Sequence, residues 1–204
     1  MTANNTKKVV YLVDDDEAVL DSLSCLLKSS GYAVNSFLSA EAFLENYDYK
    51  LSGCLILDVS MPFMNGLELQ DNLLVSKINI PIIFISGHAR VQESVKALRH
   101  GAIDFLEKPF ETEILLLRIK EAIQKDDENR AKSWEHKLIN QKIESLTAKE
   151  YDVLICLIKG FSNKEIAKMI DISPRTVEVH RAHIMEKMQV EHFTELLIML
   201  KERL

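Results

Sequence analysis

The 204-residue sequence has no apolar run close to the ~20 residues that a membrane-spanning helix needs. Its first residues, MTANNTKK, also lack the apolar stretch of a secretory signal peptide. The three cysteines, Cys25, Cys54 and Cys156, are far apart and have no paired spacing. They predict buried thiols in a reducing compartment, because a disulfide or zinc framework needs closely spaced pairs. Together these absences favour a cytoplasmic protein with no membrane partner.

A basic excess is also absent, since 25 Lys and Arg stand against 31 Asp and Glu. Residues 1–125 carry 12 basic and 17 acidic side chains, residues 126–142 carry 4 of each, and residues 143–204 carry 9 and 10. A nearly neutral tail does not indicate nucleic-acid binding by charge alone. Any such function therefore has to be argued from motifs.

Short apolar runs alternate with helical patterns over the first 125 residues. Five runs predict strands, namely VVYLV, AVNSF, CLILDV, IPIIFIS and part of AIDFLEKPF. A helical pattern follows each run, with Gly31 and Gly101 where two of the helices are expected to end. Five strand–helix units predict an α/β domain with a parallel sheet and helices on both faces.

The pattern changes after residue 125. Residues 126–142 are polar and contain no glycine or proline, which predicts a charged helical linker. Residues 143–204 predict short helices without strands, with a capping-box spacing at Thr147 and Glu150 and a helix start at Ser173–Pro174. We therefore expect a first domain over 1–125, a linker over 126–142 and a smaller all-α four-helix domain over 143–204.

Polar residues stand where the predicted strands end, which is where parallel sheets gather their functional groups. They are Asp14, Asp15, Asp16, Asp58, Ser86 and Lys108. Adjacent acids repel one another unless a cation lies between them. One interpretation is an acidic turn that caps the next helix, and the other is an oxygen-only pocket for Mg²⁺. In the second, Asp58 is the nucleophile toward a phosphoryl group, while Lys108 and Ser86 bind its oxygens.

The motifs VDDDE, LILDVSMPFMNG, FISGH and DFLEKPF occur in the order and spacing of response-regulator receiver domains, which residues 1–125 resemble. The resemblance implies the flavodoxin-like (βα)5 fold, with strand order 2-1-3-4-5, and Mg²⁺ as cofactor. It also implies site roles: Asp58 as phosphoacceptor, Asp14 and Asp15 as metal-site acids, the Ser60 carbonyl as a further metal ligand, Lys108 as phosphate-binding lysine, Ser86 as switch hydroxyl and Phe105 as switch aromatic. Asp16 is expected to be a loop or cap residue, and the Lys108–Pro109 peptide is expected to be cis, as in many receivers.

The stretch NKEIAKMIDISPRTVEVHRAHI has the pattern of a helix-turn-helix, in which the second helix enters the major groove. Ile166, Ala167 and Ile170 are expected to face inward, together with Val177 and Ile184 of the second helix. His180 and His183 are three apart on this helix, but no neighbouring cysteine or acid completes a metal site.

Residues 143–204 resemble the LuxR/NarL-type DNA-binding domain, and SPRTVEVHRA resembles the FixJ branch of response regulators. The resemblance implies base-edge contacts from Glu178, Val179 and Ala182, with Thr176 on the same exposed side. It implies phosphate contacts from Asn163, Lys164, Arg175 and Arg181. The last helix is expected to serve dimerisation through Leu196, Leu197 and Leu200.

These resemblances imply a two-component response regulator that is not itself an enzyme. A sensor histidine kinase would phosphorylate Asp58, and phosphorylation would promote a homodimer that binds promoter DNA, with RNA polymerase as a further expected partner. Three alternatives remain. The D-x-D spacing suggests a haloacid-dehalogenase-type phosphatase with Asp14 as nucleophile, although Ala18 stands where that family has a hydroxyl residue. The neutral tail with Glu178 suggests a helical adaptor that never meets DNA, and the receiver could be vestigial.

Overall fold

The computed structural model describes residues 8–48, 51–87 and 90–201. Its first part is a parallel sheet of five strands in the order β2-β1-β3-β4-β5. The strands are β1 (Val9–Val13), β2 (Ala33–Phe37), β3 (Gly53–Asp58), β4 (Ile82–Ser86) and β5 (Asp104–Glu107). This topology confirms the flavodoxin-like fold that the sequence predicted.

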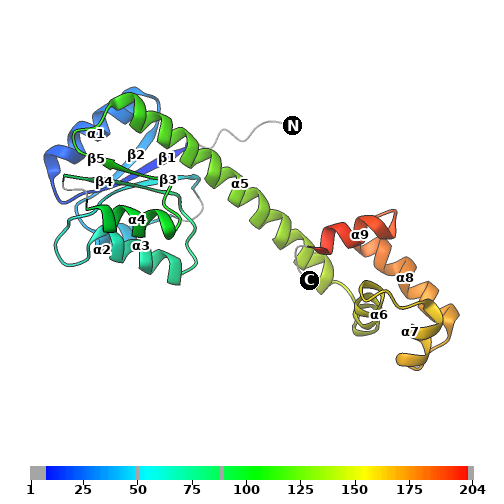
Figure 1. Ribbon diagram of the computed structural model, residues 1–204. Helices are drawn as coiled ribbons and strands as arrows, with labels where there is room; N and C mark the ends of the chain where they lie inside the picture. Colours follow the sequence, from blue (N-terminus) through cyan, green and yellow to red (C-terminus); the bar gives the residue numbers. More distant parts are fainter. Residues whose placement is uncertain (1–7, 49–50, 88–89, 202–204) are drawn as a thin grey trace. The chain divides into compact units, whose positions relative to one another are not determined.

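Helices cover both faces of the sheet (Figure 1). The helices α1 (Glu17–Ser29) and α5 (Thr112–Glu144) pack on one face, and α2 (Ala40–Asn46), α3 (Gly66–Val75) and α4 (Val91–Arg99) pack on the other. Successive side chains of a strand point to opposite faces. In β1, accordingly, Val10 and Leu12 lie in one buried core while Tyr11 and Val13 lie in the other.

Local sequence signals fix where the first helices begin and end. The Asp16 carboxylate accepts hydrogen bonds from the backbone amides of Ala18 and Val19, so Asp16 is the N-cap of α1, as expected. Gly31 and Gly101 follow α1 and α4 with φ of 90°, a conformation that glycine adopts without strain. These end signals were readable from the sequence because they depend on near neighbours.

Contacts divide the chain into two compact units, with the boundary between Arg130 and Ala131, beyond the expected domain end at residue 125. The reason is a buried polar cluster. Asp126 is 3% exposed and accepts a hydrogen bond from the Gly53 amide at 2.9 Å. Arg130 donates to Asp126 at 2.6 Å and to the Leu51 carbonyl at 2.5 Å. Residues 126–130, which the sequence predicted as linker, are thereby tied to the start of β3.

The second unit contains α6 (Ala148–Ile158), α7 (Asn163–Met169), α8 (Pro174–Met188) and α9 (Phe193–Leu200). Thr147 and Glu150 form the expected capping box, and the Ser173 hydroxyl caps α8 ahead of Pro174. The residues expected to face inward are buried, except Ile170, which is partly buried. Within the described ranges, no helix is both long enough and apolar enough to cross a membrane.

Two predictions about burial need correction. Cys25 is exposed on α1, so the prediction of three buried thiols is wrong for this residue, while Cys54 and Cys156 are buried. The inward side of α1 consists of Leu20, Leu23, Ser24 and Leu27. The second correction concerns Leu196 and Leu200, which are 0% and 3% exposed within the core of their own unit. Their side of α9 packs on that core, so it does not offer the exposed dimerisation surface that the sequence suggested.

Candidate functional site

Polar side chains meet at the carboxyl edge of the sheet. Asp14 directly follows β1, and Asp58 is the last residue of the adjacent strand β3, whose Leu57 pairs in register with Val13. Ser86 ends β4, and Lys108 follows β5 and donates its backbone amide to the Ser86 carbonyl at 2.8 Å. The β-sheet topology thus brings together residues that are distant in sequence.

Lys108 bridges the two buried carboxylates. Its ammonium nitrogen lies 2.7 Å from Oδ2 of Asp14 and 2.7 Å from Oδ1 of Asp58. The other carboxylate oxygens accept backbone amides, from Asp16 at 2.9 Å and from Ser60 at 2.6 Å. Both carboxylates are therefore held in fixed orientations. The peptide bond between Lys108 and Pro109 is cis.

The electrostatics of this pocket favour an additional cation. Burial raises the pKa of Asp14 above its usual value, even though Lys108 and the Asp16 amide oppose the shift. Burial lowers the pKa of Lys108, but its hydrogen bonds and charge interactions with the two carboxylates outweigh that effect, and the net shift is upward. Two carboxylates sharing one ammonium leave a net negative charge.

The donors at this edge fit Mg²⁺. Among the residues that the structure describes, no three or more His, Cys, Asp or Glu side chains gather into a metal cluster, and the Asp15 side chain is exposed. Mg²⁺ nevertheless needs only one or two protein carboxylates, because it keeps several of its waters. Asp14, Asp58 and the Ser60 carbonyl would supply oxygen ligands, with Asp15 beside them. Burial is the main cause of the raised pKa of Asp14, and a bound cation would favour the charged form of this carboxyl.

Ser86 is fully buried at the end of β4. Phe105 is partly buried on β5, and its ring stacks on that of Phe84 with the centroids 6.0 Å apart. Phe84 pairs directly with Phe105 in the register of β4 and β5. Phe84 was not predicted from the sequence, although the alignment of two apolar strands offered a signal for it.

Gly66, the first residue of α3, is a second position that was not predicted from the sequence. A Cβ at this position would lie 2.2 Å from the backbone oxygen of Asp58. Only glycine lets α3 begin so close to the end of β3. The NG dipeptide of the SMPFMNG loop was the available signal.

The predicted DNA-contact residues of α7 and α8 differ in how far their side chains are exposed to solvent. Arg175, Glu178, Val179 and Ala182 are exposed, and Thr176 and Arg181 are partly buried. Lys164 is exposed on α7, but Asn163 accepts a hydrogen bond from Arg181 at 2.9 Å. The Arg181 guanidinium also lies over the Phe193 ring, 5.5 Å from its centroid. Arg181 and Asn163 therefore hold α7, α8 and α9 together as well as being candidates for phosphate contacts.

Glu150 has a role beyond the cap that the sequence predicted. It is 3% exposed, and its carboxylate accepts a hydrogen bond from Lys187 of α8 at 2.6 Å. This hydrogen bond is the main reason that the pKa of Glu150 is lowered to about 2. His183 lies 3.5 Å from the same carboxylate, so an acid that is distant in sequence approaches this histidine in space. Glu150 thereby ties the start of α6 to the C-terminal half of α8.

Comparison with known proteins identifies two families in the chain. Residues 10–120 match the model of the response regulator receiver domain, and residues 144–200 match that of bacterial regulatory proteins of the luxR family. The two matches coincide with the parallel-sheet unit and with the helices α6 to α9.

Whole-chain relatives agree with these matches. The chain is 44% identical over 201 residues to response regulator protein TmoT of Ectopseudomonas mendocina, which covers 98% of this chain and 91% of that protein. It is 41% identical over 191 residues to transcriptional regulatory protein FixJ of Bradyrhizobium diazoefficiens, which covers 94% and 93%. The solved structure of response regulator StyR has a TM-score of 0.83 at 40% identity and covers 96% of this chain and 99% of that one.

Proposed function

The chain belongs to the two-component response regulators that join a receiver domain to a LuxR-type DNA-binding domain, and from this membership we propose that Asp58 is its phosphoacceptor and controls DNA binding by α8. The family consists of transcription regulators and not of enzymes, which removes the support for the phosphatase alternative. The observation that carries the proposal is the Asp58 carboxylate, buried at the end of β3 and held between Lys108 and the Ser60 amide.

The chemistry follows from these contacts. One oxygen of Asp58 attacks the phosphorus of a phosphohistidine on a sensor histidine kinase, the P–N bond breaks, and the imidazole leaves with its electron pair. The transferred group carries negative charge on three oxygens, so positioning and neutralisation dominate the reaction. Lys108 is close enough to pair with one of these oxygens. Bound Mg²⁺, held by Asp14, Asp58 and the Ser60 carbonyl, would supply further positive charge.

Phosphorylation is proposed to act through Ser86 and Phe105. The Ser86 hydroxyl would turn toward a phosphoryl oxygen, and Phe105 would move inward into the space that Ser86 leaves. The surface formed by α4, β5 and α5 would change with them and pair with the same surface of a second copy. Two receivers joined in this way would bring two DNA-binding units to a two-fold promoter site, where RNA polymerase is the expected further partner.

DNA recognition is proposed to use the exposed side of α8. Glu178, Val179 and Ala182 would approach base edges, with Thr176 beside them. Arg175, Arg181, Asn163 and Lys164 would hold phosphates, a division of roles that is common at such interfaces. With Leu196 and Leu200 buried, the partly buried Leu197 and the 72% exposed Ile198 are apolar residues of α9 that remain available for a contact between two DNA-binding units.

Intact-mass measurement tests the phosphoacceptor. The chain is incubated with Mg²⁺ and a small phosphoryl donor, either acetyl phosphate or phosphoramidate, and its mass is followed with time. The wild type should gain one phosphoryl group, and Asp58→Asn should gain none. A gain of equal size in Asp58→Asn would refute the assignment of Asp58.

A further inference from the structure

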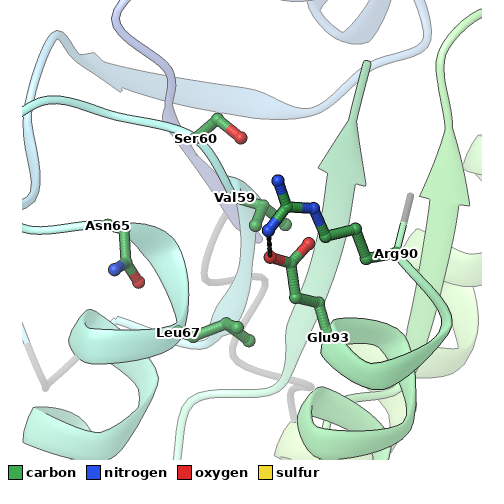
Figure 2. Close-up of a pocket in the computed structure, with 6 residues that line it drawn as sticks. All are labelled: Val59, Ser60, Asn65, Leu67, Arg90 and Glu93. Carbon is green, nitrogen blue, oxygen red and sulfur yellow. Dashed lines mark ion pairs between the residues drawn. The ribbon is translucent and has the colours of Figure 1, made fainter. Parts of the chain in front are cut away.

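A cavity lies next to the segment that follows Asp58, and of its lining residues only Ser60 has a role above. Its volume is about 430 Å³, and its lining comes from three segments (Figure 2): Val59 and Ser60 after β3, Asn65 and Leu67 at the start of α3, and Arg90 and Glu93 at the start of α4. Ser60 connects the cavity to the phosphoacceptor, because its amide donates to Oδ2 of Asp58 at 2.6 Å. Ser60 thus belongs both to the cavity lining and to the hydrogen bonds that orient the phosphoacceptor.

Among the described residues that line the cavity, Arg90 carries the positive charge. Its guanidinium is 82% exposed and lies 3.9 Å from the Glu93 carboxylate, which is a loose ion pair and longer than a hydrogen bond. Figure 2 shows the Arg90 and Glu93 side chains approaching one another next to Val59. Although Arg90 is the N-cap residue of α4, its side chain makes no capping hydrogen bond. Its guanidinium is thus placed to exchange Glu93 for the carboxylate of another molecule.

The negative charges around the phosphoacceptor would make a nearby guanidinium favourable for binding an anionic donor. Asp14, Asp58, Asp15 and Asp16 make the approach to the phosphoacceptor acidic, and Lys108 is already shared between two of them. An anionic phosphoryl donor is repelled by these carboxylates. A positive charge on the cavity side offsets that repulsion. Guanidinium also binds carboxylate groups with two parallel hydrogen bonds.

We propose that this cavity receives the acyl part of a small acyl phosphate, and that Arg90 determines the preference for such donors by pairing with the departing carboxylate. The inference rests on the proposed role of Asp58. An oxygen of Asp58 attacks phosphorus, the bond between phosphorus and the acyl oxygen breaks, and that oxygen keeps the electron pair. The leaving group is a carboxylate whose negative charge grows during the reaction, and Arg90 stabilises this charge. The Asp58 acyl phosphate and the free carboxylate account for all atoms.

Two phosphoryl donors distinguish stabilisation of the leaving carboxylate by Arg90 from a general effect of its charge. Acetyl phosphate releases acetate, an anion, whereas phosphoramidate releases ammonia, which is neutral. Phosphorylation of the intact chain is followed by intact mass in Mg²⁺ with each donor. Arg90→Ala should slow the reaction with acetyl phosphate roughly fivefold or more, because a charge-assisted hydrogen bond is lost. The rate with phosphoramidate should change less than about twofold, because removing one exposed charge has only a small effect on the interaction energy.

Two further variants complete the test. Arg99→Ala removes the same charge from the exposed end of α4 and should leave both rates unchanged. Glu93→Gln frees Arg90 from its partner and should raise the rate with acetyl phosphate, the opposite direction to Arg90→Ala. Equal slowing with both donors, or equal slowing by Arg90→Ala and Arg99→Ala, would overturn the proposal while leaving Asp58 as phosphoacceptor. If neither donor phosphorylates the wild type, the proposed function of Asp58 fails, and this inference fails with it.

Discussion

At the scale of single residues, Lys108 neutralises part of the negative charge of the phosphorylation pocket. Its ammonium is the positive charge between two carboxylates whose side chains are only 3% and 8% exposed. Burying charged groups is costly unless they are paired, and removing one partner leaves the cost without the gain. The pocket is thus held together by a charge that phosphorylation would redirect toward a phosphoryl oxygen.

Lys108→Met tests this balance. With Asp14 and Asp58 left without their shared cation, the free energy of unfolding of the receiver should fall by about 2–4 kcal/mol in the absence of divalent ions. Added Mg²⁺ should restore part of this loss, because it supplies positive charge to the same carboxylates. Urea unfolding with EDTA or with Mg²⁺ measures both effects. Lys120→Met, a change of the same kind on the exposed side of α5, is the control, and an equal loss in both variants would contradict the account.

The sequence predicted the polar residues of this pocket because each of them stands at the end of an apolar run. It could not predict that Lys108 reaches both acids, or that Asp15 points to solvent while Asp14 is buried. Those outcomes depend on the direction in which each loop leaves the sheet. The exposure of Cys25 was missed for a similar reason, since it depends on how far the sheet covers α1.

At the scale of helices and strands, polar contacts around Glu150 hold one end of α8. Lys187 donates to Glu150 and also to the Ser145 carbonyl at 3.2 Å, and Lys142 donates to the Met188 carbonyl at 3.0 Å. The C-terminal end of α8 is therefore fixed to the end of α5 and to the start of α6. The position of the helix proposed to read DNA depends on this group of contacts.

Glu150→Gln should destabilise the second unit in a pH-dependent way. The pKa of Glu150 is lowered to about 2 from the usual 4.5, mainly by the hydrogen bond from Lys187, so the carboxylate stabilises the fold above pH 4.5. This stabilisation is lost as the pH falls from 4.5 toward 2. At pH 7 we expect a loss of about 1–3 kcal/mol in the variant. The difference between the wild type and the variant should then shrink below pH 4.5.

Hydrogen exchange of the α6 and α8 amides in the intact chain measures this difference region by region. Glu186→Gln, on the exposed side of α8, is the control. A difference between Glu150→Gln and the wild type that stays constant from pH 7 to pH 2 would show that the charge of Glu150 is not the cause.

Two variants with different expected effects test the proposed DNA contacts of α7 and α8. Lys164→Ala should weaken binding to all duplexes alike and reduce the slope of log affinity against log salt by about 1, because one phosphate contact is lost. Val179→Ala should instead change the ranking of duplexes selected from a random pool. Fluorescence anisotropy of the beryllofluoride-treated chain at several salt concentrations separates the two. A changed ranking in Lys164→Ala would contradict its role as a phosphate contact.

The helices of the second unit were predictable where their signals were local. Capping residues and turns gave their boundaries, but the apolar spacing of α9 did not reveal which surface it covers. Leu196 and Leu200 fit a dimer surface and a core equally well from spacing alone. Only the packing of α9 on its own unit decided between the two.

At the scale of the whole molecule, the order of domains was visible in the change from alternating strands and helices to helices alone. The expected boundary at residue 125 stopped short of the contact boundary, because Asp126 and Arg130 look like ordinary linker charges in sequence. Their partners are the Gly53 amide and the Leu51 carbonyl, distant backbone groups that no local pattern announces. Motif order therefore gave the family and the fold, while tertiary hydrogen bonds set where the first unit ends.

The central claim is that phosphorylation of Asp58 drives assembly of the chain, and sedimentation velocity tests it most directly. The intact wild type and Asp58→Ala are compared with and without beryllofluoride and Mg²⁺, since beryllofluoride mimics an aspartyl phosphate. We expect the wild type to shift toward dimer and Asp58→Ala to stay unchanged. A wild type that does not respond, or a variant that responds equally, would contradict it.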